Sequence, residues 1–306
     1  MASNEIGPDL ESPFELREVE PSPVEETPQD LKPDSYFPSD THQPSRSTTF
    51  IGLGEHGPAY YLTRLQKYST YAFSIFATFH ITNTAIIPLI TQSVPASEPY
   101  LLLTRPYYQA RPFEPLLVAG PLFVHVASGL ALRVYRRQQS KRRYGAESRE
   151  DRKRLRWPPV SGISALGFVA VPLVMGHMLA SRVVPMWLEG GSANVGLEYI
   201  SHGFAKHPAV SFTGFSVLVS TVVWHITWGW ARWLSWTPAQ VTTGGSEGQI
   251  TRKRRWYAVN GVALVTTAIW LAGGLGIVGR GGETLGWQAK IYDQIYQSIP
   301  VVGKWF

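Results

Sequence analysis

The stretch from residue 112 to residue 157 constrains this chain most, because an apolar segment in it runs directly into a basic one. Residues 113–132 are mainly apolar and numerous enough to cross the hydrocarbon core of a bilayer as a helix. Eleven Lys and Arg residues follow between Arg133 and Arg156. Short segments this rich in Lys and Arg stay on the cytosolic side of a membrane. The stretch therefore predicts one membrane span and fixes its direction.

Four other segments share this apolar character, so the chain is expected to cross the membrane five times. The predicted spans lie near residues 68–90, 113–132, 160–180, 209–230 and 257–278. Pro88 is expected to help end the first span near residue 90, and Pro95, Pro99 and Pro106 predict a loop after it. Eighteen Lys and Arg residues flank the spans on one side and seven on the other. The N-terminus is therefore predicted on the cytosolic side, opposite the C-terminus.

Two polar segments enclose the predicted transmembrane domain of residues 59–282. Residues 1–58 are predicted to be a disordered acidic tail, since residues 1–50 hold eleven Asp and Glu, eight Pro and few large apolar side chains. Residues 283–306 predict an amphipathic segment on the membrane surface, because apolar residues recur there at every fourth position. The expected fold class is an all-α membrane protein, a five-helix transmembrane bundle with a disordered tail before it.

One short motif in the tail predicts a partner. Leu16 and Val19 precede Pro21 and Pro23, which form a Pro-x-Pro pair. Apolar side chains beside such a pair are typical of an extended segment that docks in a groove of another protein. Short Pro-x-Pro matches are also common in proline-rich tails that bind nothing, so the residues alone leave both interpretations open.

Each of the first four predicted spans carries one histidine: His80, His125, His177 and His225. Because the spans alternate in direction, His80 and His177 are expected in the non-cytosolic half of the membrane, and His125 and His225 in the cytosolic half. Paired histidines at matched depth are what a haem b iron with two imidazole ligands requires. The alternatives are hydrogen bonds that hold neighbouring helices together, or an ion or lipid path. His202 and His207 are expected in an interfacial loop.

The rest of the sequence indicates neither an enzyme nor a nucleic-acid-binding protein. No phosphate-binding glycine loop or Ser/His/Asp set stands out, and the absence of cysteine excludes disulfides, zinc–thiolate sites and iron–sulfur clusters. No metal is expected apart from a haem iron. The basic residues 133–156 lie beside a span, so their expected partners are the anionic headgroups of membrane lipids.

Three segments carry a resemblance to a known family: residues 157–167, 176–185 and 190–202. Together with the five-span plan they resemble the fungal mitochondrial adapter proteins of the MCP family. The resemblance implies a multi-pass protein of the mitochondrial outer membrane that acts in lipid homeostasis. It also implies that the cytosolic tail recruits a bridge-like lipid-transfer protein of the vacuolar-protein-sorting class at membrane contact sites.

The resemblance assigns roles to particular residues. Pro21 and Pro23 would be the prolines of the recruiting motif, with Val19 as the apolar residue before them. The membrane domain of the family is similar to the haem-binding anchor subunits of succinate dehydrogenase and fumarate reductase. The candidate axial ligands are therefore His80, His125, His177 and His225. The expected function is that of an adaptor. The alternatives are a b-type haem protein that passes electrons across the membrane, and a lipid scramblase.

Overall fold

The computed structural model describes residues 57–146, 148–300 and 303–305, all within the unit of the chain that begins at His56. Every regular element among these residues is a helix. Five helical segments are long and apolar enough to cross a membrane: Pro58–Thr91, Pro115–Arg143, Gly162–Glu189, Pro208–Gln240 and Gly245–Arg280. The predicted all-α, five-span fold is confirmed. The tail motif of Leu16, Val19, Pro21 and Pro23 lies outside the described residues.

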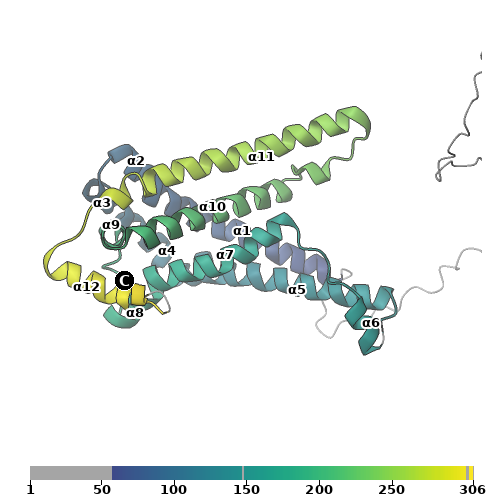
Figure 1. Ribbon diagram of the computed structural model, residues 1–306, viewed down its shortest axis with the longest axis horizontal. Coiled ribbons are helices and arrows are strands. Elements are labelled where there is room, and N and C mark those ends of the chain that lie inside the picture. The colour runs from purple at the N-terminus through teal and green to yellow at the C-terminus, as the bar shows by residue number, and fades with distance from the viewer. Residues whose placement is uncertain (1–56, 147, 301–302, 306) are drawn as a thin grey trace, which may run out of the picture. The chain divides into compact units, whose positions relative to one another are not determined.

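The main helices of the spans are α1 (Pro58–Ile81), α5 (Gly120–Arg143), α7 (Gly162–Met178), α10 (Pro208–Trp233) and α11 (Gly245–Gly274). Figure 1 shows them running roughly along one direction, with α1 against α5 and with α10 between α7 and α11. A buried cluster of Ala85, Val219, Val223 and Trp270 joins the first, fourth and fifth spans. The fifth span approaches the first closely here, because buried Gly273 meets the backbone of Ala85.

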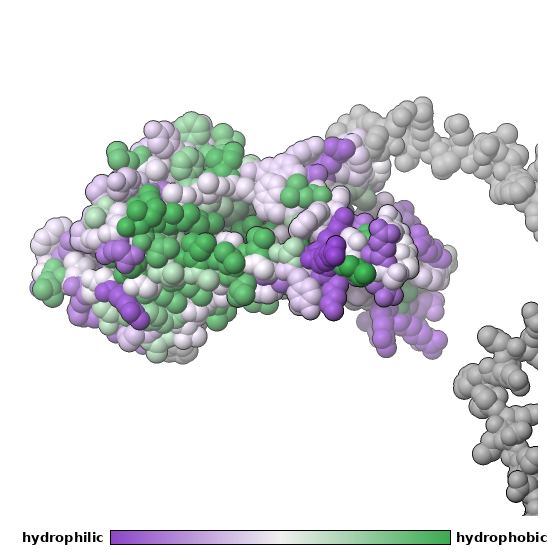
Figure 2. Space-filling view, turned by 90° about the horizontal axis from the view of Figure 1, so that it is seen from above, coloured by the Kyte–Doolittle hydropathy of each residue, from purple (hydrophilic) through white to green (hydrophobic). Residues whose placement is uncertain are grey.

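The outer surface of the bundle is apolar where lipid is expected. Phe123 and Leu264, on different spans, expose 73% and 63% of their surface. Figure 2 shows such residues gathered over the middle of the unit, with hydrophilic residues concentrated at one end. An exposed apolar surface of this extent suits hydrocarbon, where helices satisfy their own backbone hydrogen bonds.

Three spans contain one wide π-helical turn each, at Thr82–Ile86, Pro115–Ala119 and Leu179–Val183. In each, the backbone N–H after the turn bonds the carbonyl five residues earlier, as Ile87 does with Thr82. A proline lies in or just after each turn, and proline lacks the N–H for an ordinary helical bond. The first span ends at Thr91 in α2 (Ile87–Thr91), within one residue of the predicted end at residue 90, and Pro88 stands in the first turn of this last helix.

Short helices cover the end of the bundle that carries the π turns; we call them the cap. They are α3 (Val94–Thr104), α4 (Pro106–Gln109), α8 (Val184–Glu189), α9 (Leu197–Lys206) and α12 (Gly286–Gln297). The predicted loop after the first span is therefore wrong. Pro95 and Pro106 stand in the first turn of α3 and α4, where proline costs no hydrogen bond, and only Pro99 lies inside a helix. The amphipathic pattern after Arg280 forms α12, which buries Ile295 in the cap.

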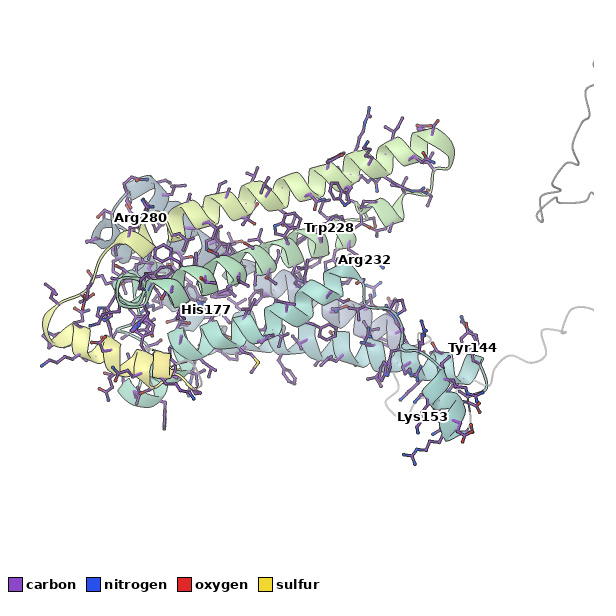
Figure 3. The ribbon with its side chains drawn as sticks, viewed as in Figure 1. Tyr144, Lys153, His177, Trp228, Arg232 and Arg280 are labelled. Atoms are coloured by element: carbon purple, nitrogen blue, oxygen red, sulfur yellow. The ribbon has the colours of Figure 1, made fainter. Side chains whose placement is uncertain are left out.

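The opposite end, which we call the basic end, comprises the last turns of α5, the short helix α6 (Arg149–Arg154) and the first turns of α11. Figure 3 places Tyr144 and Lys153 there and Arg280 at the other end. Buried Arg137 donates hydrogen bonds to the carbonyls of Arg152 and Arg156, each at 2.7 Å. Its guanidinium also lies 5.3 Å from the ring centre of Trp157. The basic segment is therefore a helical hairpin fastened to the span that precedes it.

Candidate functional site

The four histidines of the spans meet in two pairs. The ring centroids of His80 and His177 are 5.8 Å apart, and those of His125 and His225 are 6.0 Å apart. Figure 3 shows His177 among the helices. The pairing at two depths expected from the sequence is found, with the first pair toward the cap and the second toward the basic end. The role of these residues as ligands stays a prediction.

In the pair nearer the basic end, a backbone carbonyl lies within hydrogen-bond distance of each histidine's Nδ1 atom. The Nδ1 atom of His225 lies 2.9 Å from the carbonyl oxygen of Ile163, and that of His125 lies 3.3 Å from the carbonyl oxygen of Gln66. Nδ1 of His125 also lies 3.2 Å from the hydroxyl of Thr70, which can donate or accept. A carbonyl oxygen only accepts, so Nδ1 of His225 carries the hydrogen and its Nε2 keeps its lone pair. This is the arrangement in which a backbone carbonyl orients a metal-ligating imidazole. A Cβ at Gly167 would lie 2.9 Å from Cε1 of His225, so the ring needs a glycine beside it.

The ring spacing can be compared with that of a haem iron. Two iron–nitrogen bonds of about 2 Å each, added to the half-widths of two imidazole rings, place the ring centroids about 6 Å apart. Both observed spacings lie near this value. The donor set and its spacing therefore fit an iron with two imidazole ligands.

The pair nearer the cap lines a large cavity between the spans. His80 stacks on Phe76, with ring centroids 5.3 Å apart, and its ring meets the edge of the buried Trp270. The cavity has a volume of about 580 Å³. Its walls are mainly apolar, and its charged residues lie with several polar ones where the bundle meets the cap: Arg105, Tyr108, Gln109, Glu114, Arg182 and Ser192.

Two arginines organise the polar end of the cavity. Arg182 donates to both carboxylate oxygens of Glu114, each at 2.6 Å, and to the hydroxyl of Ser192. Arg105 donates to the carbonyls of Ser192 and Ala193, at 3.2 and 3.1 Å, and to that of Val195. Arg182 therefore joins the loop between α8 and α9 to the third span and to the start of the second, and Arg105 joins the same loop to the segment between α3 and α4 in the cap. The segment at residues 190–202, which carries part of the family resemblance, therefore forms one wall of the cavity.

The start of α9 is fixed by Glu98. Its Oε2 atom accepts the backbone N–H of Leu197 at 2.7 Å, which satisfies a free donor at the helix N-terminus. A Cβ on Gly196 would overlap this carboxyl, so a larger residue there would displace the Glu98 side chain from its present position. Burial raises the pKa of Glu98, although the Leu197 hydrogen bond and nearby Arg105 oppose the rise.

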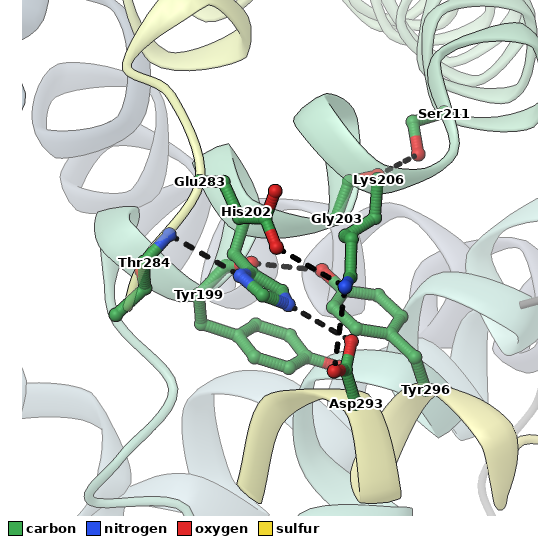
Figure 4. A network of polar contacts seen from close by, with 9 residues as sticks. All are labelled: Tyr199, His202, Gly203, Lys206, Ser211, Glu283, Thr284, Asp293 and Tyr296. Carbon is green, nitrogen blue, oxygen red and sulfur yellow. Dashed lines mark hydrogen bonds and ion pairs between the residues drawn. The ribbon is translucent and has the colours of Figure 1, made fainter. Parts of the chain in front are cut away.

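A network of polar contacts ties α12 to α9, as Figure 4 shows. Fully buried His202 pairs with Asp293 through Nε2 at 3.1 Å and accepts the backbone N–H of Thr284 at 3.3 Å. Lys206 completes it, 3.1 Å from Glu283 and 3.6 Å from Asp293. The prediction of an interfacial loop for His202 is wrong, since the residue lies on α9 with no exposed surface. The polar groups of this network bond to neighbouring protein groups, so we assign it the role of holding the C-terminal segment against α9.

Sequence reasoning missed the polar residues of the cavity: Glu98, Arg105, Glu114 and Arg182. Their partners lie 68 to 99 positions away in the chain, so no local pattern reveals them. The one available signal was the position of Glu114 and Arg182 inside or beside apolar spans, where a charge needs a partner. Groups of three or more His, Asp or Glu that could hold a metal ion do not occur among the described residues.

Part of the chain matches a known family. The model of the transmembrane domain of MDM10-complementing protein 1 matches residues 172–283. This segment includes His177, the cavity wall at residues 190–202, α10 with His225, and the whole of α11. No curated protein and no solved structure matches the chain.

Proposed function

We propose that this chain, whose residues 172–283 match the transmembrane-domain model of MDM10-complementing protein 1, belongs to that family and is a membrane adaptor. Its tail recruits a bridge-like lipid-transfer protein of the vacuolar-protein-sorting class to the mitochondrial outer membrane. There it acts in lipid homeostasis at contact sites with other membranes. The observation that carries the proposal is the family match, on a five-span anchor whose two ends differ strongly in charge. The role requires no catalytic site and no nucleic acid.

The charge of the basic end supports a cytosolic tail. The first span begins at Pro58 and carries Arg64 and Lys67 close to its start. Four basic residues in a row, Arg252–Arg255, lie in the first turns of α11. In antiparallel spans these groups lie on the same side as the hairpin of α5 and α6. Because Lys and Arg near span ends stay on the cytosolic side, the tail that precedes Pro58 leaves the membrane toward the cytosol.

The composition of the tail supports a recruiting role. Pro21 and Pro23 restrict the backbone before binding, so docking costs less conformational entropy than for a flexible segment. Leu16 and Val19 supply apolar side chains for pockets beside a proline groove. So few contacts give an affinity on the order of micromolar, which suits reversible recruitment.

The test replaces Pro21 and Pro23 together by Ala. Recruitment of the lipid-transfer protein, followed by imaging of a tagged partner, should be lost while the mitochondrial location of the protein is unchanged, because the spans are untouched. A matched control replaces Pro28 and Pro33, which lie in the same tail. A peptide of residues 14–26 should compete with the full chain. Normal recruitment by the Pro21/Pro23 variant would place the partner site elsewhere, with the basic end as the next candidate.

A second candidate function is haem binding, and the two histidine pairs favour it. His125 and His225 would supply one pair of Nε2 atoms, and the carbonyl of Ile163 at Nδ1 leaves that of His225 free. His80 and His177 would supply a second pair. A haem iron between two imidazoles exchanges single electrons, which would make the bundle a transmembrane electron carrier. The protein would provide the ligands and an apolar surrounding that excludes water.

Absorption spectroscopy tests this second function. The purified, reduced protein should show a b-type spectrum that weakens in His225→Ala and in His125→Ala. His207→Ala removes a histidine outside the spans and serves as the control. A colourless but stably folded preparation from haem-replete cells would reject haem binding and leave the four histidines as contacts between helices.

A further inference from the structure

The cavity between the spans carries an unbalanced positive charge at its polar end. Arg182 is neutralised by Glu114, with two hydrogen bonds of 2.6 Å. Arg105 has no carboxylate within ion-pair distance among the described residues. Glu98 is near enough to interact with it, but this carboxyl is engaged by the N–H of Leu197. A cation beside a membrane cavity is costly unless an anion joins it.

The two guanidinium groups also retain hydrogen-bond donors. Each has five N–H groups, and the bonds to protein atoms use three on Arg105 and three on Arg182. Nε of Arg105 is buried and has no hydrogen-bond partner. Tyr108 and Gln109 line the same end of the cavity. This end therefore offers both charge and donors to an oxyanion.

The rest of the cavity suits a hydrocarbon chain. Phe73, Leu122, Leu173 and Leu218, from four different spans, contribute to its walls. At Gly176 and Gly214 no atom lies within 4 Å of the place where a Cβ would be, so the space beside both glycines is open. The volume of about 580 Å³ lies within the range of about 300–1,000 Å³ that holds one small ligand.

We propose that this cavity binds an amphiphile with one long acyl chain and an anionic head, either carboxylate or phosphate. The head lies against Arg105 and Arg182, whose planar guanidinium groups match the oxygens of both kinds of head. The chain extends along the apolar walls past His80 toward the middle of the bundle. A long-chain fatty acid or a lysophosphatidic acid has this chemistry. The proposal is independent of the adaptor role and of haem at His125 and His225, but it excludes a haem at His80 and His177, which line the same cavity.

Photo-crosslinking of the full-length purified protein in detergent tests the proposal. The probe is a palmitate analogue with a diazirine in its chain, and the labelled residues are mapped by mass spectrometry. Labelling should fall on the cavity walls. Palmitate or lysophosphatidic acid should compete with the probe, and hexadecanol, which has the same chain and no charge, should compete at least about tenfold less well because it lacks a charge-assisted hydrogen bond. Equal competition by hexadecanol would overturn the anionic head.

Two variants locate the site. Gly214→Leu fills the cavity and should abolish labelling, whereas Gly261→Leu makes the same change at an exposed position with free space around it. Arg105→Gln should weaken competition by palmitate about tenfold and leave hexadecanol unchanged, while Arg105→Lys should retain most of the binding. Arg111→Gln, at an exposed arginine outside the cavity, is the control.

Unchanged labelling in Gly214→Leu, with a retained thermal transition, would overturn the proposal. So would a b-type haem spectrum that disappears in Gly214→Leu, since it would assign the cavity itself to haem.

Discussion

Replacing Gly273 by Ala tests how closely the fifth span approaches the first. Gly273 is buried in α11, and a Cβ there would overlap the carbonyl oxygen of Ala85 and lie 2.6 Å from its carbonyl carbon. Observed Cβ atoms essentially never come closer than 3.0 Å to such a neighbour. The atoms in the way belong to the backbone of the π turn Thr82–Ile86, so no side-chain rotation relieves the overlap. The two helices must separate, which disturbs the packing of Trp270 against Ala85.

The expected magnitude follows from a matched pair of variants. Gly261 lies on the same helix with open space around it, so Gly261→Ala should gain about 1 kcal/mol from helix propensity. Gly273→Ala has the same gain but loses about 1–3 kcal/mol to overpacking. The difference between the two variants therefore isolates the steric cost, about 2 kcal/mol. For a domain of this size that corresponds to a midpoint about 4–8 °C lower for Gly273→Ala.

Thermal unfolding in detergent, followed by tryptophan fluorescence, measures this difference. The chain has eleven tryptophans, and Trp270 lies one helical turn from the substitution. Both variants should insert into the membrane to the same extent, because neither changes the hydropathy of the span appreciably. Equal midpoints for Gly261→Ala and Gly273→Ala would refute the close contact between α11 and the first span.

Three further outcomes are expected. Burial raises the pKa of Glu98 above its ordinary value of 4.5, so the folded chain holds this proton more tightly than the unfolded chain does. The stability that this carboxyl contributes therefore falls as the pH rises above 4.5. Glu98→Gln retains an acceptor for the N–H of Leu197, and its thermal midpoint should fall less with rising pH than that of the unchanged chain. An unaltered dependence of the midpoint on pH would contradict this. Arg137→Ala should make residues 144–157 sensitive to protease while the midpoint of the spans changes little, with exposed Arg136→Ala as control. Protease added to intact mitochondria should remove an N-terminal tag and spare a C-terminal tag until the outer membrane is opened, and the reverse result would invert the orientation.

The parts of the fold that were predictable rest on local patterns. The five spans were predictable from the lengths of the apolar segments. The two depths of the histidine pairs followed from the alternating direction of the spans. Both predictions need only distances along the chain. The cap was not predictable in the same way. Pro95 and Pro106 act as loop signals in the sequence, yet each occupies a first helical turn where its missing N–H is harmless.

The polar end of the cavity depends on contacts between distant segments. Arg105 meets a loop 87 to 90 residues later, and Glu114 meets Arg182 across two spans. The fold of the cap over the bundle decides which charged residues pair. No periodic pattern in the sequence predicts how the cap folds. His202 was misplaced for a related reason: the glycines and polar residues before it are typical of a loop, and the loop ends at Gly196, where Glu98 starts a helix.

The π turns have a consequence for how this sequence compares with its relatives. A π turn holds one residue more than an α-helical turn, so three spans each carry one residue that is surplus to a regular helix. Loss of that residue would restore α geometry without rotating the helix on either side of it. The turns at Thr82–Ile86 and Leu179–Val183 each begin two residues after a histidine of the same pair, His80 or His177. Alignments of related chains should therefore place single-residue gaps at these turns, and a gap placed before either histidine would turn its ring away from its partner.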